Sequence, residues 1–421
     1  MKINFDKIIR SISIALDLAE ISSMDESDKE IIEDVTNINY SEHKFMHHAQ
    51  RTAYISLELA CQLNLPENSR KLIYIASLLH DIGAASCLNQ SHNSHTYIYE
   101  HCTIGANITK NFPIFNNLSD IILYHHENFD GTGAMKVLGN DIPIESQIIR
   151  LADLVDVSYS EKKPSFKQKN RIINWVKGNS KKIFSADLVD AFLNCSKRDN
   201  FWFNLENILS MDFILDSICP NLNIYLDIHQ FEEIAYMFSQ IIDNKSKFTA
   251  KHSHSISNLA YKVSKYLNYP EEKCIKMRIA GLLHDIGKLA VPTKILDKNS
   301  SLSSDEFSII KSHVYYTKII LDRIEDIPDI SEWASNHHEK LNGNGYPRGL
   351  CADNLSEESR IMSVCDIYQA LTEDRPYRKG LSDDKTFAIM DEMVKENFIC
   401  EKALSYLKGS LGYIEKNPLE H

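Results

Sequence analysis

A histidine and an aspartate stand side by side at residues 284 and 285, where an apolar helical segment ends. A carboxylate has two oxygens and can bridge two metal ions, whereas an imidazole nitrogen binds only one. A doublet at the end of a buried helix therefore indicates a dinuclear metal site, provided that other segments supply further ligands. On its own, such a pair is more often an ordinary polar contact near a helix end.

Further candidate ligands lie on both sides of this doublet. With it they make five histidines and two aspartates, spread over 115 residues: His252, His284, Asp285, His313, His337, His338 and Asp366. Imidazole and carboxylate ligands without a thiolate suit Fe, Mn, Ni, Co or Zn. Because these residues are far apart in the chain, a metal site requires that several segments meet.

Four sequence phrases accompany these residues in one order. They are His284-Asp285-Ile286-Gly287-Lys288, His337-His338-Glu339, Gly343-Asn344-Gly345-Tyr346-Pro347 and Asp374-Arg375-Pro376-Tyr377-Arg378. On these phrases, residues 225–400 strongly resemble the HD-GYP domain, a branch of the HD metal-dependent phosphohydrolases. Agreement in so many separated phrases is hard to obtain by chance.

The resemblance implies how the metals are bound. One metal would be held by His252, His284, Asp285 and Asp366. Asp285 would bridge to a second metal, completed by His313, His337 and His338. Some members bind a third metal through a glutamate four residues before the first histidine, but Phe248 stands there. We therefore expect two divalent transition metals, Fe or Mn first, with Ni, Co and Zn as alternatives.

The resemblance also implies a reaction, the hydrolysis of a phosphodiester by a hydroxide that bridges the two metals and attacks phosphorus in line. Asp285 and Lys288 would be the catalytic residues, since Lys288 adds positive charge beside the phosphoryl oxygens. Substrate contacts are expected at Lys288, Tyr346, Pro347, Arg375 and Arg378. The expected substrates are cyclic dinucleotides, cyclic di-GMP by default or 3′,3′-cyclic GMP-AMP. The loop begins with Asn342 where members usually have aspartate, which leaves the preference open.

The N-terminal half repeats the series of candidate ligands. The repeated residues are His48, His80, Asp81, His101, His125, His126 and Asp153. The first three precede their counterparts by 204 residues, the next three by 212 and the last by 213, which indicates a tandem duplication. This copy is a second candidate metal site. It has Ala84 in place of Lys288 and Ala134-Met135 in place of Tyr346-Pro347, so it lacks the expected substrate contacts.

The elements that must position these residues read as helices. Apolar residues recur at helical spacing along most of the chain, and alternating strand patterns are scarce, so we predict an all-α fold of two tandem HD-type domains joined by a helical linker. The expected divisions are an N-terminal HD domain at 1–160, the linker at 161–224 and the catalytic HD-GYP domain at 225–418. Residues 419–421 are expected to be a tag remnant.

Composition limits the remaining choices. At 421 residues the chain is long for a single core. Its formal net charge of −12 argues against binding polymeric nucleic acid or an anionic membrane. No apolar run approaches the ~20 residues that span a bilayer, and the first residues lack the apolar core of a signal peptide. Nine cysteines without a CxxC pair fit a reducing, cytoplasmic environment.

Several alternatives stay open. The N-terminal copy is either an inactive regulatory or dimerising partner, or a second hydrolase that removes the 5′-phosphate from the linear product. A rival from another class is a non-catalytic cyclic-dinucleotide receptor or signalling scaffold, since the family's GYP loop is linked to contacts with diguanylate cyclase domains. A third is an HD hydrolase acting on nucleotides or (p)ppGpp, against which the Gly-Tyr-Pro phrase argues. The sequence leaves a homodimer open.

Overall fold

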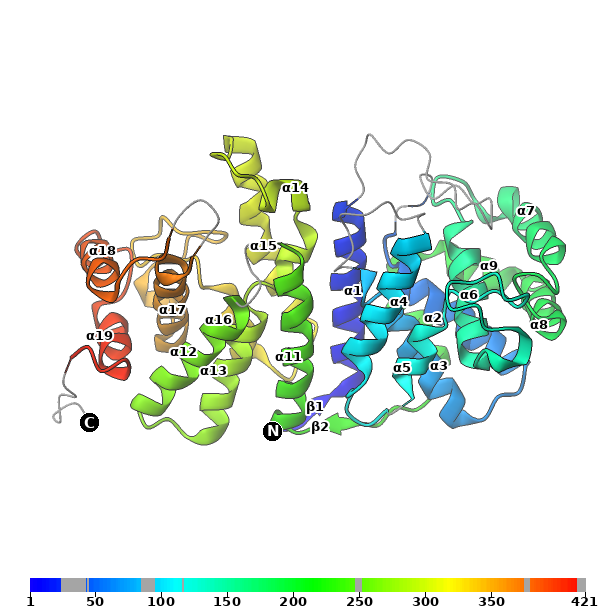
Figure 1. Cartoon of the computed structure of the whole chain (residues 1–421), viewed down its shortest axis with the longest axis horizontal. Coiled ribbons are helices and arrows are strands. Elements are labelled where there is room, and N and C mark those ends of the chain that lie inside the picture. The colour runs from blue at the N-terminus through cyan, green and yellow to red at the C-terminus, as the bar shows by residue number, and fades with distance from the viewer. Residues whose placement is uncertain are drawn as a thin grey trace. The chain divides into compact units, whose positions relative to one another are not determined.

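Helices make up most of the chain (Figure 1). The computed structural model describes residues 1–23, 43, 45–84, 95–115, 117–246, 252–374 and 379–414. Among these residues, the strands are the two-residue β1 (Ile3–Asn4) and β2 (Tyr225–Leu226), which pair antiparallel with Ile3 opposite Leu226. The all-α prediction is therefore confirmed.

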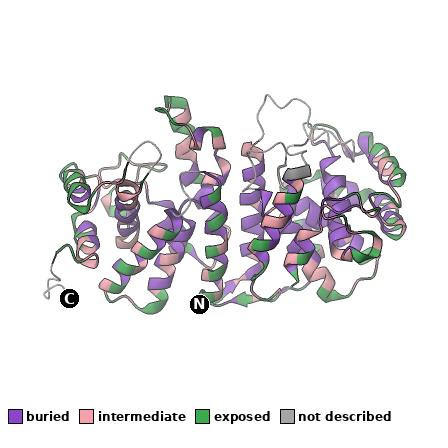
Figure 2. Cartoon of the chain, in the orientation of Figure 1, coloured by how far each residue is buried: buried purple, intermediate pink, exposed green. Residues whose placement is uncertain are grey.

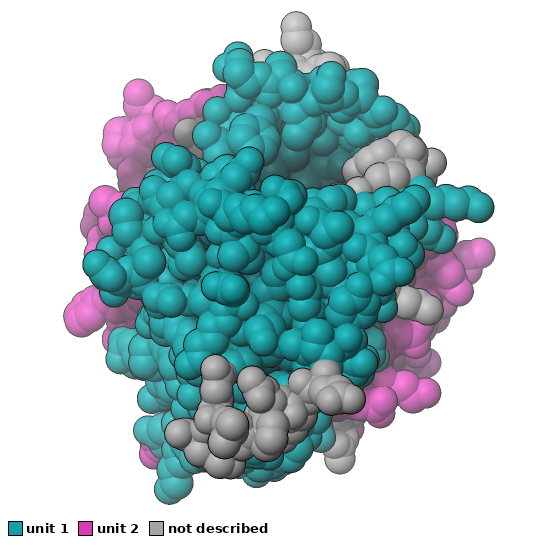
Figure 3. All heavy atoms as spheres, turned by 90° about the vertical axis from the view of Figure 1, so that its left-hand side faces the viewer, with its two compact units in different colours: residues 1–7, 225–421 teal, residues 8–224 magenta. Residues whose placement is uncertain are grey.

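The chain divides into two compact units, coloured separately in Figure 3. Unit 2 comprises residues 8–224, and unit 1 comprises residues 1–7 with 225–421. The segment 161–224, which the sequence suggested as a linker, forms helices within unit 2. These are α7 (Ser165–Gly178), α8 (Ala186–Ser196), α9 (Asp199–Glu206) and α10 (Met211–Ile218), with the 3-10 helix η4 (Ile208–Ser210).

Unit 2 is built around a helix that is buried on nearly all sides. This helix is α6 (Ile144–Val157). Besides α6 and the helices of 161–224, the unit contains α1 (Phe5–Ser23), α2 (His48–Gln62), α3 (Glu67–Leu79), α4 (His95–Thr109), α5 (Leu118–Leu123) and the 3-10 helix η3 (Gly139–Asp141). In α6 every residue from Ser146 to Val157 is buried (Figure 2). Because α6 packs against α2 and α3, its polar residue Asp153 is held inside the unit.

Unit 1 repeats this plan. Its helices are α11 (Ile228–Asn244), α12 (His252–Tyr266), α13 (Glu271–Leu283), α14 (Thr293–Leu296), α15 (Ser304–Asp322), α16 (Pro328–Ser335), α17 (Glu357–Thr372), α18 (Asp383–Lys395) and α19 (Glu401–Ser410), with the 3-10 helices η5 (Ile286–Ala290) and η6 (Ala352–Asn354). Helix α17 packs against α12, α16 and α19, in the position that α6 has in unit 2. Ser303 and Glu306 form a capping box that fixes the start of α15.

A glycine two residues after each His-Asp doublet allows a close approach between segments. A Cβ on Gly287 would lie 1.9 Å from the carbonyl oxygen of His313, and a Cβ on Gly83 would lie 2.1 Å from that of His101. Any side chain there would push the two segments apart. The glycine thus lets the doublet sit directly beside the next candidate ligand in each unit.

None of the helices in the described part of the chain is long and apolar enough to cross a bilayer.

Candidate metal centres

Asp285 lies between two groups of imidazoles in unit 1. Its Oδ2 is 3.1 Å from Nε2 of His284 and 3.8 Å from Nε2 of His252. Its Oδ1 is 3.4 Å from Nε2 of His313 and 3.9 Å from Nε2 of His337. Each oxygen therefore faces its own pair of ring nitrogens, which is the arrangement that a bridging carboxylate requires.

Asp366 and His338 extend the two groups. Asp366, on α17, has Oδ1 3.4 Å from Nε2 of His252 and Oδ2 3.8 Å from Nδ1 of His338. Within the described residues, the ligand atoms of two sets each lie within 4.8 Å of one another: His252, His284 and Asp366, and His313, His337 and His338. The structure thus brings together all seven residues that the sequence predicts as ligands, from α12, α15, α17 and the segments that follow α13 and α16.

Hydrogen bonds to the backbone orient three of these rings. Nδ1 of His284 lies 2.8 Å from the carbonyl oxygen of Gly281, and His313 and His337 make the same contact three residues back, at 2.6 and 2.7 Å. A neutral ring that donates from Nδ1 has its Nε2 lone pair directed at Asp285, the pattern seen in metal-binding histidines.

Two buried atoms at the centre of this cluster lack a hydrogen-bond partner. They are Nε2 of His284 and Oδ1 of Asp285. Leaving such atoms unpaired is costly, and a divalent cation would satisfy both. The donor set therefore fits the divalent metal ions that the sequence led us to expect.

The pKa shifts within the cluster are also those expected of a metal site. Burial lowers the pKa of His313 to about 3 and that of His337 well below its ordinary value. Burial opposes ionisation of Asp285, but His284 and Lys288 hold its carboxyl pKa well below the usual range. Neutral imidazoles beside an ionised carboxylate are the protonation states that a metal requires.

His252 is the exception within the cluster. Burial lowers its pKa, but hydrogen bonds to Asp366 and Glu373 outweigh this effect and raise the pKa to about 9. Glu373 accepts from Nδ1 of His252 at 3.2 Å. The sequence reasoning missed Glu373, although its position directly before the Asp374-Arg375 phrase could have drawn attention to it.

The cluster forms part of the wall of a cavity of about 650 Å³ in unit 1. Lys288 lines it and places Nζ 2.6 Å from Oδ2 of Asp285. Tyr346 lines it too, with its ring centroid 4.8 Å from that of His338. Polar residues of the segment 298–301 contribute further to the lining. The volume lies in the range of small-molecule sites.

The loop that carries Tyr346 is held by Glu339. The carboxylate of Glu339 accepts hydrogen bonds from the backbone nitrogens of Arg348 at 2.8 Å and Leu350 at 2.9 Å. A Cβ on Gly345 would lie 2.5 Å from Cα of Glu339, so only glycine fits there. Pro347 is exposed in the same loop. The predicted substrate residues Arg375 and Arg378 lie outside the described residues.

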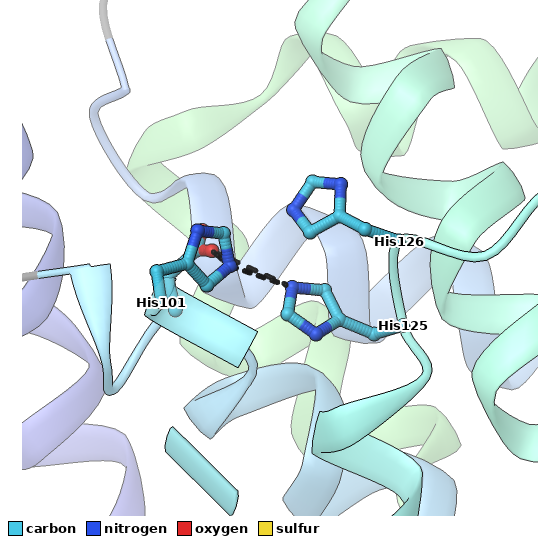
Figure 4. Close-up of side chains that lie close together, drawn as sticks. His101, His125 and His126 are labelled. Atoms are coloured by element: carbon cyan, nitrogen blue, oxygen red, sulfur yellow. Dashed lines mark hydrogen bonds and ion pairs between the residues drawn. The ribbon is translucent and has the colours of Figure 1, made fainter. Parts of the chain in front are cut away.

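Unit 2 contains a second cluster of the same design. Oδ2 of Asp81 is 2.9 Å from Nε2 of His80 and 3.5 Å from Nε2 of His48. Its Oδ1 is 3.5 Å from Nε2 of His101 and 3.8 Å from Nε2 of His125. Figure 4 shows the ring of His101, from α4, beside the rings of His125 and His126, which follow α5. His48, His80 and Asp153 form a further set within 4.8 Å, so all seven predicted residues meet here too.

The surroundings of this second cluster differ from those of the first. Asp156 accepts from Nδ1 of His48 at 2.7 Å and from Nε of Arg51 at 2.5 Å. Arg150 is buried, with Nη1 2.8 Å from Nδ1 of His126 and 3.9 Å from Oδ2 of Asp153. Sequence reasoning missed Arg51, Arg150 and Asp156, because none of them belongs to a phrase that the two copies share.

Comparison with known proteins agrees with this geometry. The HD domain family matches residues 35–172 and again residues 236–399, so the chain belongs to the HD domain family, with one match in each copy. The resemblance drawn from the sequence is thereby confirmed.

Particular relatives are more specific. The chain is 30% identical over 360 residues to the 3'3'-cGAMP-specific phosphodiesterase 1 of Vibrio cholerae, covering 82% of each chain. It is 31% identical over 296 residues to the 3'3'-cGAMP-specific phosphodiesterase 3 of the same organism, covering 70% of this chain and 63% of the relative. A cyclic di-GMP phosphodiesterase of Pseudomonas aeruginosa, PA4108, is 36% identical over 140 residues, covering 33% of this chain and 34% of the relative.

A solved structure shares the fold over nearly its full length. The crystal structure of a cyclic GMP-AMP specific phosphodiesterase of V. cholerae aligns with a TM-score of 0.67 at 23% identity, covering 98% of this chain and 99% of that one. The fold of this chain is thus found in a solved structure.

Proposed function

We propose that this chain is a metal-dependent phosphodiesterase that hydrolyses cyclic dinucleotides to linear dinucleotides at the cluster in unit 1. The observation that carries the proposal is Asp285, whose two oxygens face separate imidazole groups beside the Lys288 ammonium, in a cavity of about 650 Å³. The relatives named above support the substrate class, since each is named for a cyclic dinucleotide.

The residues of the unit 1 cluster would hold two divalent transition metals, with Fe or Mn the first candidates. When bound, such a pair supplies a nucleophile from water near neutral pH and positive charge for the phosphoryl oxygens. His252, His284 and Asp366 would serve one ion, His313, His337 and His338 the other, and Asp285 both. These ions would also offset the chain's net negative charge towards an anionic substrate.

The chain's own residues would bind and orient the substrate. Lys288 brings a charged donor to the edge of the cluster, within reach of a phosphoryl oxygen. Tyr346 presents an aromatic face beside His338, suited to stacking on a base. Glu339 holds the backbone of this loop and so keeps Tyr346 in place.

The names of the relatives indicate two candidate substrates and an order of preference between them. The relative matched over 82% of both chains is named for 3′,3′-cyclic GMP-AMP, whereas a relative matched over a third of the chain is named for cyclic di-GMP. We therefore propose cyclic GMP-AMP and cyclic di-GMP, in that order.

The test compares paired variants of the two clusters. Metal-loaded protein purified without oxygen is incubated with cyclic GMP-AMP, cyclic di-GMP or cyclic di-AMP, and the products are separated by anion-exchange chromatography. His284→Ala/Asp285→Ala should reduce formation of linear dinucleotide to background, while the matched His80→Ala/Asp81→Ala variant retains it. Full activity in the first variant would contradict the proposal and favour a receptor.

The unit 2 cluster has a second candidate activity, the removal of the 5′-phosphate from the linear product. It is favoured by the survival of the complete ligand arrangement around Asp81. The alternative is a regulatory role, favoured by Ala84 in place of Lys288. In the same assay, loss of inorganic phosphate release in His80→Ala/Asp81→Ala alone would exclude the regulatory alternative.

A further inference from the structure

Helix α1 places the carboxylate of Glu20 at the unit 2 cluster, and Glu20 belongs to none of the repeated sequence phrases. Glu20 is 6% exposed, and its Oε2 has no hydrogen-bond partner. Its carboxyl lies against Asp81, the candidate bridging residue. The charged groups acting most on it are Asp81, His48 and Asp17. A buried side chain with an unpaired oxygen thus lies beside the candidate bridging residue Asp81.

Unit 1 has no carboxylate at the position that corresponds to Glu20, where Ser246 stands. Asp17 Oδ1 accepts from the backbone nitrogen of Ala49 at 3.1 Å, and Asp243 Oδ1 accepts from that of Ser253 at 3.2 Å. Ala49 and Ser253 are counterparts at the offset of 204, so Asp17 and Asp243 correspond in space. Three residues further along stand Glu20 in unit 2 and Ser246 in unit 1.

These replacements alter the charge around the bridging carboxylate. In unit 1, Ser246 donates to Asp297 at 2.6 Å and lines the cavity, while Lys288 pairs with Asp285. In unit 2 the lysine is replaced by Ala84 and the serine by Glu20.

Arg150 supplies one positive charge to unit 2, beside His126 and Asp153. Glu20 is buried and Asp81 is partly buried, so two carboxylates still lie in contact, which is costly unless a cation lies between them.

We propose that Glu20 is a ligand of the cation held beside His48 and Asp81, and that this centre prefers an oxygen-seeking divalent cation such as Mn²⁺. A bound ion would satisfy the buried Oε2 of Glu20, which has no hydrogen-bond partner in the described part of the chain. Harder cations favour additional carboxylate ligands, so unit 2, which adds Glu20 to the ligand types that both clusters share, should favour Mn²⁺ more than unit 1 does. The inference rests on metal binding by the unit 2 cluster.

The experiment measures Mn²⁺ binding in a chain whose unit 1 cluster is disabled by His284→Ala/Asp285→Ala. In this background, titration calorimetry and elemental analysis report on unit 2 alone. Glu20→Gln should weaken Mn²⁺ binding roughly 10- to 100-fold, the range seen when residues around a metal are removed. Asp120→Asn, which removes an exposed carboxylate of α5, should leave binding unchanged and serves as the matched control.

Thermal unfolding separates a ligand from a packing residue. With chelator, Glu20→Gln should be no less stable than the background chain, since it removes a carboxylate that is buried against Asp81. With Mn²⁺ it should show a smaller rise in Tm. If Glu20→Gln and Asp120→Asn bind Mn²⁺ alike, or if Glu20→Gln lowers Tm equally with and without metal, the inference is wrong. If the background chain itself binds no Mn²⁺, the metal site proposed in unit 2 is wrong as well.

Discussion

At the scale of single residues, the clusters combine two kinds of group whose roles are set by their surroundings. Histidines such as His284 and His313 are fixed by carbonyl oxygens three residues back, which leaves Nε2 for a metal. Lys288 is different, because its ammonium contacts Asp285 while also lining the cavity. An ammonium group at this position cannot bind a metal ion, but it can stabilise negative charge on the oxygens of a phosphoryl group.

Replacing Lys288 should therefore separate metal binding from turnover. We expect Lys288→Met to lower kcat/KM for the cyclic dinucleotide about 100-fold, the usual effect of removing one charged donor from a transition state. Metal content should be unchanged or higher, since a positive charge next to Asp285 is removed. Steady-state kinetics and elemental analysis on the same samples give both values.

The control for Lys288→Met is Lys318→Met, because Lys318 pairs with Asp322 on α15. Its kinetics should match those of the parent chain. A Lys288→Met variant that loses its metal together with its activity would show that the lysine supports the cluster rather than the reaction.

The candidate ligands could be predicted from the sequence because they recur at fixed offsets and sit in recognisable phrases. Residues such as Glu20, Glu373 and Arg150 do not recur in the other copy, so the repeat gives no signal for them. Which carboxylate in a distant helix will meet a given histidine depends on packing, which a single sequence does not reveal.

At the scale of elements, the first residue of α17 makes side-chain contacts with neighbouring segments. Glu357, the first residue of α17, accepts from the hydroxyl of Tyr269, which lies in the turn between α12 and α13. The contact is 2.6 Å long, and Lys402 of α19 lies 3.5 Å from the same carboxylate. A negative charge at a helix N-terminus also interacts favourably with the helix dipole. This residue therefore joins three helices around α17, which carries Asp366.

The effect of Glu357 should depend on pH. Burial opposes its ionisation, but the hydrogen bond from Tyr269 and the charge of Lys402 lower its pKa below the ordinary 4.5. A carboxyl with a lowered folded-state pKa stabilises the fold above its unfolded-state pKa, and the contribution is lost as pH falls through the folded-state value. Because the side chain is 41% exposed, the contribution is small, about 0.5–1 kcal/mol at pH 7.

Urea unfolding of Glu357→Gln and the parent chain checks this expectation. The free energy of unfolding should differ by about 0.5–1 kcal/mol at pH 7, and the difference should shrink below pH 4.5. Glu401→Gln, which alters an exposed glutamate at the start of α19, serves as control. An equal loss of stability at both pH values would mean that the carboxylate charge is unimportant.

Helix content was predictable from apolar spacing, but the boundaries of the units were not. The sequence suggested a linker at 161–224, and the structure includes those helices in unit 2. It also assigns residues 1–7 to unit 1, where β1 pairs with β2. A strand pair of two residues each, more than 200 positions apart in the chain, leaves no periodic signal in the sequence.

At the scale of the whole molecule, each of the two units carries a cluster of candidate metal ligands of the same design. Both clusters place unpaired or mutually repelling polar groups inside a core, such as Oδ1 of Asp285 and the carboxyls of Glu20 and Asp81. Such groups lower stability unless a cation is bound. Metal binding should therefore be part of the stability of each unit as well as of its chemistry.

Metal removal should accordingly destabilise the parent chain through both units. An ion present at 100 times its dissociation constant contributes about 2.7 kcal/mol, and for units of this size each kcal/mol shifts Tm by roughly 2–4 °C. Chelation should thus lower Tm by about 5–10 °C in calorimetry. His80→Ala/Asp81→Ala and His284→Ala/Asp285→Ala should each abolish the part of the shift that belongs to their own unit, because each removes a bridging aspartate. If His80→Ala/Asp81→Ala keeps the full metal-dependent shift, unit 2 does not draw stability from a bound ion, and its preserved ligand set must be explained by packing alone.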